Sequence, residues 1–538
     1  MEPVIAIGLA VVLWLAIKVY NSGRRAKHLP PGPPTIPLLG NLHIFPTDRP
    51  FAKFTEWARM YGDIYSLKMA NSTAIVLSSM SAVKELMDAR SAETGDRPKV
   101  YILDYVTDGL HVGLAPLGSH VWKTARKAIK PLLAPQTLNA YRPVAYAESS
   151  QLMYDMLHKP EGFYAQTQRV TFSFATSIVF GCRCPWFESH ELTHFIEVVR
   201  LWMALTSTKV PPLDLLPFLK YVPERWAPWK KLARDTKALQ HDIYFTMLSS
   251  AERRLAKGEG NGSFIEGILQ NQKTLEMNRE FVGHLGGILL EGGSDTTSTF
   301  LQSFILALIA FPDAQRKAHE EIDRVIGHDR SPVFTDLADM PYIQAVIKEV
   351  HRFRPVAPLA VPHSTTVPLE YRGYIIPQGT TLFLNLWGVL HDPEVYERPE
   401  EFWPDRYVMS EFGTKAGVDS QDFRASLPFG SGKRLCPGMS LATMSLSLHV
   451  MNILWAFRFS PAIDPDTGLK IPVDLEAYFS GLSYTPRPFR ATVTPRHPGR
   501  AEIIDRQFFA STDTYRRYEE HLSAADRESL ETMRAAGY

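Results

Sequence analysis

The pattern of hydrophobic and polar positions begins with an apolar run from Pro3 to Tyr20, which Arg24, Arg25 and Lys27 follow. As a helix, such a run extends roughly 27 Å at about 1.5 Å per residue, enough to cross a thin bilayer such as that of the endoplasmic reticulum. A cleaved signal peptide is the alternative, but it requires positive charge before the apolar run. The order found here predicts an uncleaved N-terminal transmembrane helix, with the rest of the chain in the cytosol.

A second long apolar run extends from Phe281 to Phe311. Glu291, Asp295 and five glycines interrupt it, and charged groups near its centre would be costly in lipid. We therefore predict a buried helix that crosses a large domain. Two of the glycines are adjacent, just before Asp295, and each lowers helix stability by roughly 1 kcal/mol relative to alanine. They predict a local opening of the helix.

Shorter patterns predict the elements between these runs and the C-terminus. Prolines between residues 209 and 229 exclude a long helix. The large apolar residues of this segment, set among charges, are typical of a membrane interface, with a buried loop as the alternative. Residues 371–379 have the pattern of a hairpin. Asp339 and Pro341 predict the cap and first turn of a helix. The buried stripe of that helix would comprise Ile343, Val346, Ile347 and Val350.

Composition narrows the class of protein. With 538 residues, 45% apolar and 21% charged, the chain can form a large globular core. A formal net charge of +1 gives no broad electrostatic footprint for nucleic acid. Three cysteines argue against a disulfide framework and for a reducing compartment. Two of them, Cys182 and Cys184, are interpreted as structural thiols, because no further Cys or His pair nearby completes a metal site.

The third cysteine is the strongest candidate for chemistry. It stands in the run Phe429-Gly-Ser-Gly-Lys-Arg434-Leu-Cys436-Pro-Gly438, ahead of an apolar helical stretch. A cysteine thiolate can bind iron, and flanking glycines let the backbone approach a flat cofactor. The start of a helix would lower the pKa of the thiol. At every fixed position the run resembles F-x-x-G-x-R-x-C-x-G, the haem-binding signature of the cytochrome P-450 family.

Other motifs extend this resemblance in the order typical of the family. Residues 292–297, Gly-Gly-Ser-Asp-Thr-Thr, are similar to the A/G-G-x-D/E-T-T/S motif of the distal helix, which implies that Asp295 and Thr296 relay protons during oxygen activation. Trp122 and Arg126 match W-x-x-x-R, whose side chains bind a haem propionate in the family. His363, after an extended apolar segment, fits a further propionate contact, together with Arg434.

Three residues resemble the structural triad of the family. Glu349 and Arg352 match E-x-x-R, and Arg406 lies in Phe-Trp-Pro-Asp-Arg-Tyr, which resembles the F-x-P-E-R-F box with Asp405 for Glu and Tyr407 for Phe. The resemblance implies that the three side chains form a buried ionic group. Removing Glu349 would then leave two buried cations unpaired, at a cost on the order of 3 to 5 kcal/mol.

The resemblance implies the cytochrome P-450 fold: mainly α with a small β lobe, in a single haem domain over residues 46–495. This domain would follow a membrane anchor in residues 1–22 and a proline-rich hinge in residues 23–45. A polar tail, residues 496–538, would follow it. The recognition segments of the family imply a hydrophobic substrate pocket. Its residues would be Tyr101, Ile102, Leu103, Leu289, Val356, Leu359, Phe479 and Leu482.

The implied activity is monooxygenation, in which one atom of O2 enters a hydrophobic organic substrate and the other leaves as water. The implied cofactor is haem b, with Cys436 as the ligand of the metal. Electrons would come from an NADPH-dependent cytochrome P-450 reductase, with cytochrome b5 as a second donor. The overall pattern is most similar to fungal members of secondary or xenobiotic metabolism, of the O-methylsterigmatocystin oxidoreductase type. A basic face of this chain would dock the reductase; the alternative is that these charges are only solvated. The residues of the basic face are Lys123, Arg126, Lys127, Lys130 and Lys433.

Three other functions remain as alternatives. A haem-thiolate isomerase or dehydratase would need no dioxygen, and Asp295 and Thr296 speak against it. A non-enzymatic haem sensor or electron carrier is disfavoured by the apolar pocket segments. A cysteine-nucleophile hydrolase would need a base beside Cys436, and no motif supplies one.

Overall fold

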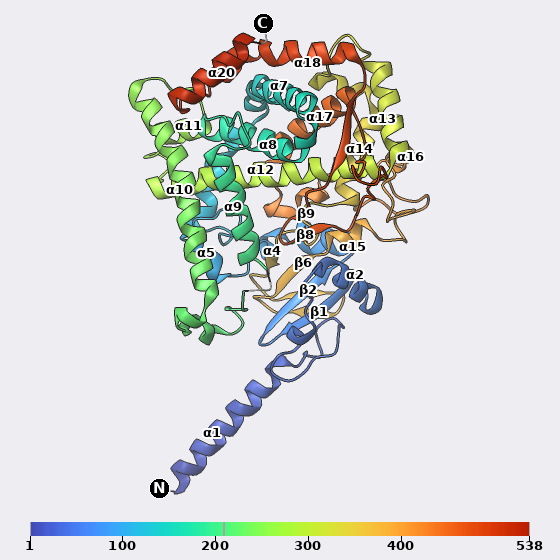
Figure 1. The fold of residues 1–538 in the computed structure, drawn as a ribbon. Coiled ribbons are helices and arrows are strands. Elements are labelled where there is room, and N and C mark those ends of the chain that lie inside the picture. The colour runs from blue at the N-terminus through green and yellow to red at the C-terminus, as the bar shows by residue number, and fades with distance from the viewer. Residues whose placement is uncertain (1, 208–209, 537–538) are drawn as a thin grey trace.

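A computed structural model describes residues 2–207 and 210–536 of the chain. The longest helix, α12 (Arg279–Ala310), runs through the middle of the body and packs against α8 (Phe163–Phe180) and α10 (Pro228–Lys257) (Figure 1). Helices predominate, and the strands form small sheets beside them. The predicted mainly α fold with a small β lobe is therefore confirmed.

The glycines of α12 have two different surroundings. A Cβ atom added to Gly287 would lie 2.3 Å from ring atoms of Tyr244, so this glycine allows the aromatic ring to approach the helix. At Gly292 the same atom would meet nothing within 4 Å. The predicted local opening at Gly292 is wrong, because α12 is one unbroken helix. The Thr296 hydroxyl donates a hydrogen bond to the Gly292 carbonyl at 2.7 Å, which covers the carbonyl within the helix.

The largest sheet has four strands in the order β1–β2–β6–β3. β1 pairs with β2 and β3 pairs with β6 in antiparallel directions, whereas β2 and β6 are parallel. The part of the chain that the structure describes also has three two-stranded sheets, and one of them, β4 with β5, forms the hairpin predicted at residues 371–379. The strands are β1 (Ile64–Met69), β2 (Ser72–Leu77), β3 (His363–Ser364), β4 (Leu369–Tyr371), β5 (Tyr374–Ile376), β6 (Thr381–Leu384), β7 (Phe457–Pro461), β8 (Tyr478–Ser480), β9 (Tyr484–Pro486) and β10 (Ala491–Pro495).

The main hydrophobic core lies where the C-terminal half of α12 meets α7, α14 and α17. A second core joins α8, α9, α10 and the N-terminal half of α12. The remaining helices are α1 (Glu2–Tyr20), α2 (Pro50–Tyr61), α3 (Met80–Val83), α4 (Ser91–Thr94), α5 (Tyr101–Thr107), α6 (His120–Leu132), α7 (Pro135–His158), α9 (His190–Leu205), α11 (Phe264–Gln270), α13 (Pro312–Val325), α14 (Pro341–Phe353), α15 (Leu386–Leu390), α16 (Asp405–Met409), α17 (Met439–Ala456), α18 (Pro498–Ala510), α19 (Thr512–Arg516) and α20 (Ala524–Ala536).

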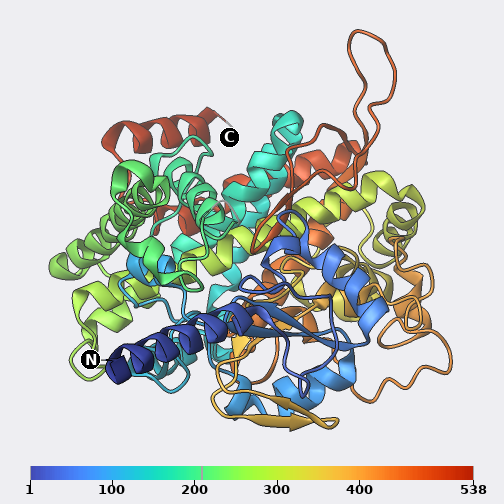
Figure 2. The ribbon, with the colours of Figure 1, turned by 90° about the horizontal axis from the view of Figure 1, so that it is seen from below.

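The helix α1 projects away from the body (Figure 1), and its large apolar side chains, such as Ile7 and Trp14, are exposed. In the view from below, α1 lies in front of the blue strands of the four-stranded sheet (Figure 2). The apolar stretch that includes most of α1, Ile7–Gly23, is shorter than α17. α17 is long and apolar enough to cross a membrane, but 67% of it is buried in the body. A membrane anchor in α1 therefore stays a proposal.

The residues predicted as a polar tail form helices that pack on the body. α18 and α19 contact α7 on the side of the molecule opposite α1 (Figure 1). Glu519 accepts hydrogen bonds from Arg183 at 2.6 Å and from Arg534 at 2.7 Å, and all three side chains are at most 5% exposed. This buried ionic network ties the C-terminal helices to the segment after α8.

Candidate active site around Cys436

Cys436 lies in a tight loop between a 3₁₀ turn, Gly432–Arg434, and the start of α17. Its backbone N–H donates to the Phe429 carbonyl at 2.9 Å. Gly432 has a φ of 55°, and a Cβ atom there would lie 2.2 Å from the Met87 carbonyl oxygen, so the close approach requires glycine. The Asp88 carboxylate accepts from the Gly432 N–H at 3.0 Å and fixes the loop.

The environment of the Cys436 thiol combines opposing effects. Burial raises its pKa, while the N–H groups of Gly438 and Met439 and the charge of Arg126 act to lower it. The net direction is upward, although the N–H groups at the start of α17 act in the predicted direction and lower it. Desolvation outweighs the N–H groups, because the thiol is largely enclosed. The residues placed closest to the sulfur nonetheless favour its anionic form.

Basic side chains gather beside this loop. Arg434 donates to the carbonyls of Gly95 and Ala115, both at 2.7 Å, and its guanidinium lies 5.7 Å from the ring centre of Trp122. Arg97 donates to the carbonyls of Val361 and Pro362. Burial and the charge of Arg434 lower the pKa of Arg97 to about 9. Backbone carbonyls, with the charge of Asp96 nearby, therefore hold two half-buried cations close together, an arrangement suited to binding an anionic group.

His363 and Arg126 belong to the same group. His363 is 4% exposed, and its Nδ1 atom lies 3.1 Å from the Thr94 carbonyl oxygen. Burial, followed by the charges of Arg97 and Arg434, lowers the pKa of His363 to about 3. Burial lowers the pKa of Arg434 to about 10, Asp96 opposes this, and the charge of Arg126, on α6 one turn after Trp122, adds to the lowering. The four predicted propionate contacts thus converge, and the structure adds Arg97, which sequence reasoning missed.

On α12, Asp295 and Thr296 lie in different surroundings. Thr296 is exposed, although most of the helix is buried, whereas burial raises the pKa of Asp295 to about 6. The Asp295 carboxylate accepts a hydrogen bond from Ser483 at 3.1 Å. Ser483 lies 188 residues away along the chain, and no motif in the sequence marks it.

The residues of the predicted triad come together in the core. Glu349 receives two hydrogen bonds from Arg352, at 2.8 and 2.9 Å, and lies 3.2 Å from Arg406. The remaining donors of both arginines bind backbone carbonyls of the segment 390–401. The Trp403 N–H also donates to Glu349. The group therefore joins α14 to the irregular chain that precedes the Cys436 loop.

The eight predicted pocket residues fall in several places. Ile102 and Leu103 are buried in a cluster with Trp202 of α9. Leu289 packs beside the core formed by α8, α10 and α12, and Val356 and Leu359 beside other core clusters. Tyr101, Phe479 and Leu482 have exposed side chains, 38% to 51% of their surface. Tyr101 faces Lys220, whose ammonium lies 4.4 Å from the ring centre.

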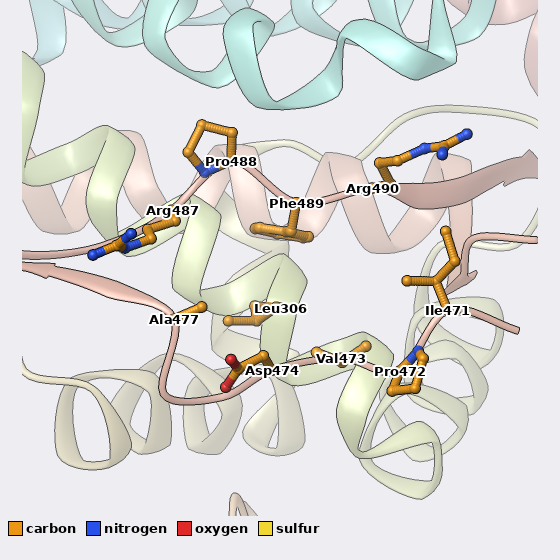
Figure 3. Close-up of a pocket in the computed structure, with 10 residues that line it drawn as sticks. All are labelled: Leu306, Ile471, Pro472, Val473, Asp474, Ala477, Arg487, Pro488, Phe489 and Arg490. Carbon is orange, nitrogen blue, oxygen red and sulfur yellow. The ribbon is translucent and has the colours of Figure 1, made fainter. Parts of the chain in front are cut away.

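A cavity of about 270 Å³ opens elsewhere, between the segments 471–477 and 487–490. In Figure 3 the Phe489 ring lies above Leu306 and Val473, while the side chains of Arg487 and Arg490 point in opposite directions. None of the eight predicted pocket residues lines this cavity, so it is separate from the predicted substrate pocket.

The comparison with known proteins identifies the class that these features define. Residues 30–488 match the Cytochrome P450 family, and the chain belongs to this family. A cytochrome P450 monooxygenase of Armillaria gallica is 39% identical over 94% of this chain and 96% of its own length. A cytochrome P450 monooxygenase of Arthrobotrys oligospora is 36% identical over 96% of this chain and 98% of its own length. Another, of Aspergillus niger, is 37% identical over 94% of this chain and 96% of its own length.

The protein is thus a haem-thiolate monooxygenase of the cytochrome P450 family. The relatives named above all carry the name monooxygenase and span nearly the whole chain, which disfavours an isomerase, a sensor or a hydrolase. They are fungal proteins, as the sequence pattern indicated.

Proposed function

We propose that this protein inserts one oxygen atom from O2 into a hydrophobic secondary metabolite or xenobiotic at the membrane of the endoplasmic reticulum. NADPH-cytochrome P450 reductase supplies the electrons, with cytochrome b5 as a second donor. The observation that carries the proposal is the convergence of Arg97, Arg126, Arg434 and neutral His363, from separate segments of the chain, beside the Cys436 loop.

The residues around Cys436 fit haem b. The sulfur is the ligand for iron, and Gly438 lies beside it, where a Cβ atom would be in ordinary contact with Sγ at 3.8 Å. Arg434 and Arg97, held by neutral carbonyls, are suited to the two propionates, with Trp122, Arg126 and His363 beside them. Haem bound through a thiolate supplies the chemistry of O–O bond cleavage.

We assign proton delivery to Asp295 and Thr296. A carboxylate with a pKa of about 6 can gain and release a proton near neutral pH, which a carboxylate with its ordinary pKa of 3.8 does far less readily. Thr296 is the next residue; it is exposed beside Gly292 and Gly293, and its hydroxyl donates to the Gly292 carbonyl. Gly292 leaves open space one turn away.

Membrane attachment is assigned to two regions. α1 projects from the body with its apolar residues exposed, and the 3₁₀ turns Pro217–Tyr221 and Glu224–Trp226 lie on the same lower side (Figure 1). Phe218, Tyr221 and Trp226 are 65%, 86% and 64% exposed. Exposed aromatic residues of this kind are favoured at the interface between lipid and water.

A carbon monoxide difference spectrum of the reduced, haem-loaded protein tests the assignment of Cys436. The wild type should show the red-shifted absorption of a thiolate ligand, and Cys436→His should lose it while retaining haem. Cys184→Ser is the matched control and should leave the spectrum unchanged. A folded, pigmented wild type without the red shift would contradict the proposal. Screening aromatic, terpenoid, polyketide and steroid compounds for a shift of the Soret band, followed by product analysis, then defines the substrate.

A further inference from the structure

The hairpin of β8 and β9 reaches α12 through a chain of hydroxyl groups. Ser483, in the turn of the hairpin, donates to Asp295 at 3.1 Å. The Thr485 hydroxyl lies 3.4 Å from that of Ser483 and 2.8 Å from that of Thr299. Asp295 and Thr299 are one turn apart on α12, so the chain begins and ends on the same helix. Ser483 is 6% exposed, and its hydroxyl is therefore fixed by these partners.

The charge of Asp295 is balanced by no cation. Among residues 2–207 and 210–536, no Lys, Arg or His forms an ion pair with it, and Ser483 is the side chain that hydrogen-bonds to it. Burial raises the pKa of Asp295 and the Ser483 hydrogen bond lowers it, with a net value of about 6. A hydrogen bond from a neutral donor thus takes the place that an ion pair would have.

The groups that face Asp295 come from each neighbouring element. On α12, Glu291 lies one turn earlier and is hydrogen-bonded to Gln240 and Tyr244 of α10. On α8, Tyr164 is close enough for the Asp295 charge to raise its pKa. α9 contributes apolar residues, and with α8 it borders a cavity of about 30 Å³ next to Asp295, room for a water molecule. Other lining residues are Gln168, Thr171, Ser294 and Ser298.

We propose that Ser483 is a positioning residue, which orients the Asp295 carboxylate and thereby links the β8–β9 hairpin to proton delivery. This inference rests on the proposed role of Asp295. The hairpin also carries Phe479 and Leu482, two of the predicted pocket residues, so a substrate that contacts them acts on the same turn that holds Asp295. Substrate binding and the orientation of the Asp295 carboxylate are then coupled through the Ser483 hydroxyl.

Infrared spectroscopy tests the contact directly. Haem-loaded ferric protein is titrated between pH 4.5 and 8, and the C=O band of the protonated carboxylic acid is assigned to Asp295 by its loss in Asp295→Asn. The protonated Glu291 carboxyl should absorb in the same region of the spectrum, and Glu291→Gln removes that second C=O band. Ser483→Ala should move the midpoint of the Asp295 band upward by about one pH unit, because the donor that favours the anion is gone. Ser483→Thr, which keeps a hydroxyl, should retain the wild-type midpoint.

Ser480→Ala is the matched control. Ser480 lies on β8 of the same hairpin, but its hydroxyl accepts from the Arg49 N–H at 3.2 Å instead of contacting Asp295. A Ser483→Ala midpoint equal to the wild type, or a Ser480→Ala shift of the same size, would overturn the proposal. The carbon monoxide spectrum of each variant verifies that the haem site is intact.

A second measurement separates this inference from the role of Asp295 itself. With reductase and NADPH, the fraction of electrons released as hydrogen peroxide should rise in Asp295→Asn and, by a smaller factor, in Ser483→Ala. If Asp295→Asn leaves peroxide release unchanged, the proposed proton role of Asp295 fails. The infrared shift in Ser483→Ala still decides whether Ser483 positions the carboxylate.

Discussion

Glu349 and Arg352 form a fully buried ion pair, with both carboxylate oxygens within 2.9 Å of the guanidinium and both side chains 0% exposed. Since Arg406 shares the same carboxylate, one acidic residue neutralises two buried cations. Such an arrangement is sensitive to the loss of the acid, because the remaining charges cannot reach water.

We therefore expect Glu349→Ala to lose on the order of 3 to 5 kcal/mol of stability and to yield haem-free or insoluble protein. Haem content per mole of soluble protein is the measurement. Glu320→Ala is the control, because it removes an acid that is 63% exposed and pairs with Arg316, a contact worth about 1 kcal/mol or less. Normal haem content in Glu349→Ala would contradict this account.

The C-terminal helices should contribute comparably to stability. Glu519→Ala leaves Arg183 and Arg534 buried without their shared partner, so thermal unfolding of the holoprotein should occur at a clearly lower temperature. Asp513→Ala, in the same region but with a 97% exposed side chain, should have little effect. Equal unfolding temperatures for both variants would show that the network does not hold the tail.

Asp295 should make the stability of the protein depend on pH. Its pKa in the folded protein, about 6, lies above the ordinary 3.8, so its contribution is complete below about pH 4 and is lost as pH rises through 6. Asp295→Asn avoids this loss. Its stability relative to wild type should rise between pH 4.5 and 7.5 by on the order of 1 to 3 kcal/mol, measured by unfolding. Asp313→Asn is the control and should show no change over this range, because Arg316 lowers the pKa of Asp313 below 3.8 and the carboxyl stays ionised in both the folded and the unfolded state above pH 4.5.

Membrane binding by the aromatic turns can be isolated by deleting residues 1–22. In this shortened chain, Phe218→Ser with Trp226→Ser should weaken binding to liposomes by about tenfold or more, since each exposed aromatic side chain contributes on the order of 1.5 kcal/mol when it enters the interface. Met409→Ser is the control, because Met409 is 67% exposed on α16. Unchanged binding in the double variant would exclude contact through these turns.

Docking of the reductase should depend on the exposed lysines of α6 and the Cys436 loop. Lys127→Glu and Lys433→Glu should each raise the KM for reductase by about 3- to 10-fold at low ionic strength, and the effect should shrink in salt. Lys231→Glu, on α10 and 67% exposed, should change it little. Turnover that is insensitive to both salt and these substitutions would mean that the basic face is only solvated.

Much of the site could be predicted from the sequence because its motifs are local. The Cys436 loop, the acidic residue on α12 and the E-x-x-R pair each lie within ten residues, and helical spacing fixes the geometry of the last two. The contacts that were missed join distant segments. Asp88 fixes the Cys436 loop across 344 residues, and Ser483 reaches Asp295 across 188. Pairing of this kind depends on tertiary packing, which no local pattern records.

The same limit explains a wrong prediction at a helix start. Asp339 was expected to cap the helix that begins at Pro341, but Met340 occupies the cap position. The carboxylate of Glu321, on α13, accepts from the N–H groups of Tyr342 and Ile343 at 3.0 and 2.8 Å instead. The free N–H groups required a partner, and a neighbouring helix supplied it.

The contact between Arg183 and Glu519 has a consequence for biosynthesis. These residues are 336 positions apart, so a nascent chain that has already made α8 still lacks the acid that neutralises Arg183. During translation this arginine must remain hydrated, or rely on Glu148 alone, until the final helices leave the ribosome. Completion of the native interior is thereby deferred to the last moments of synthesis.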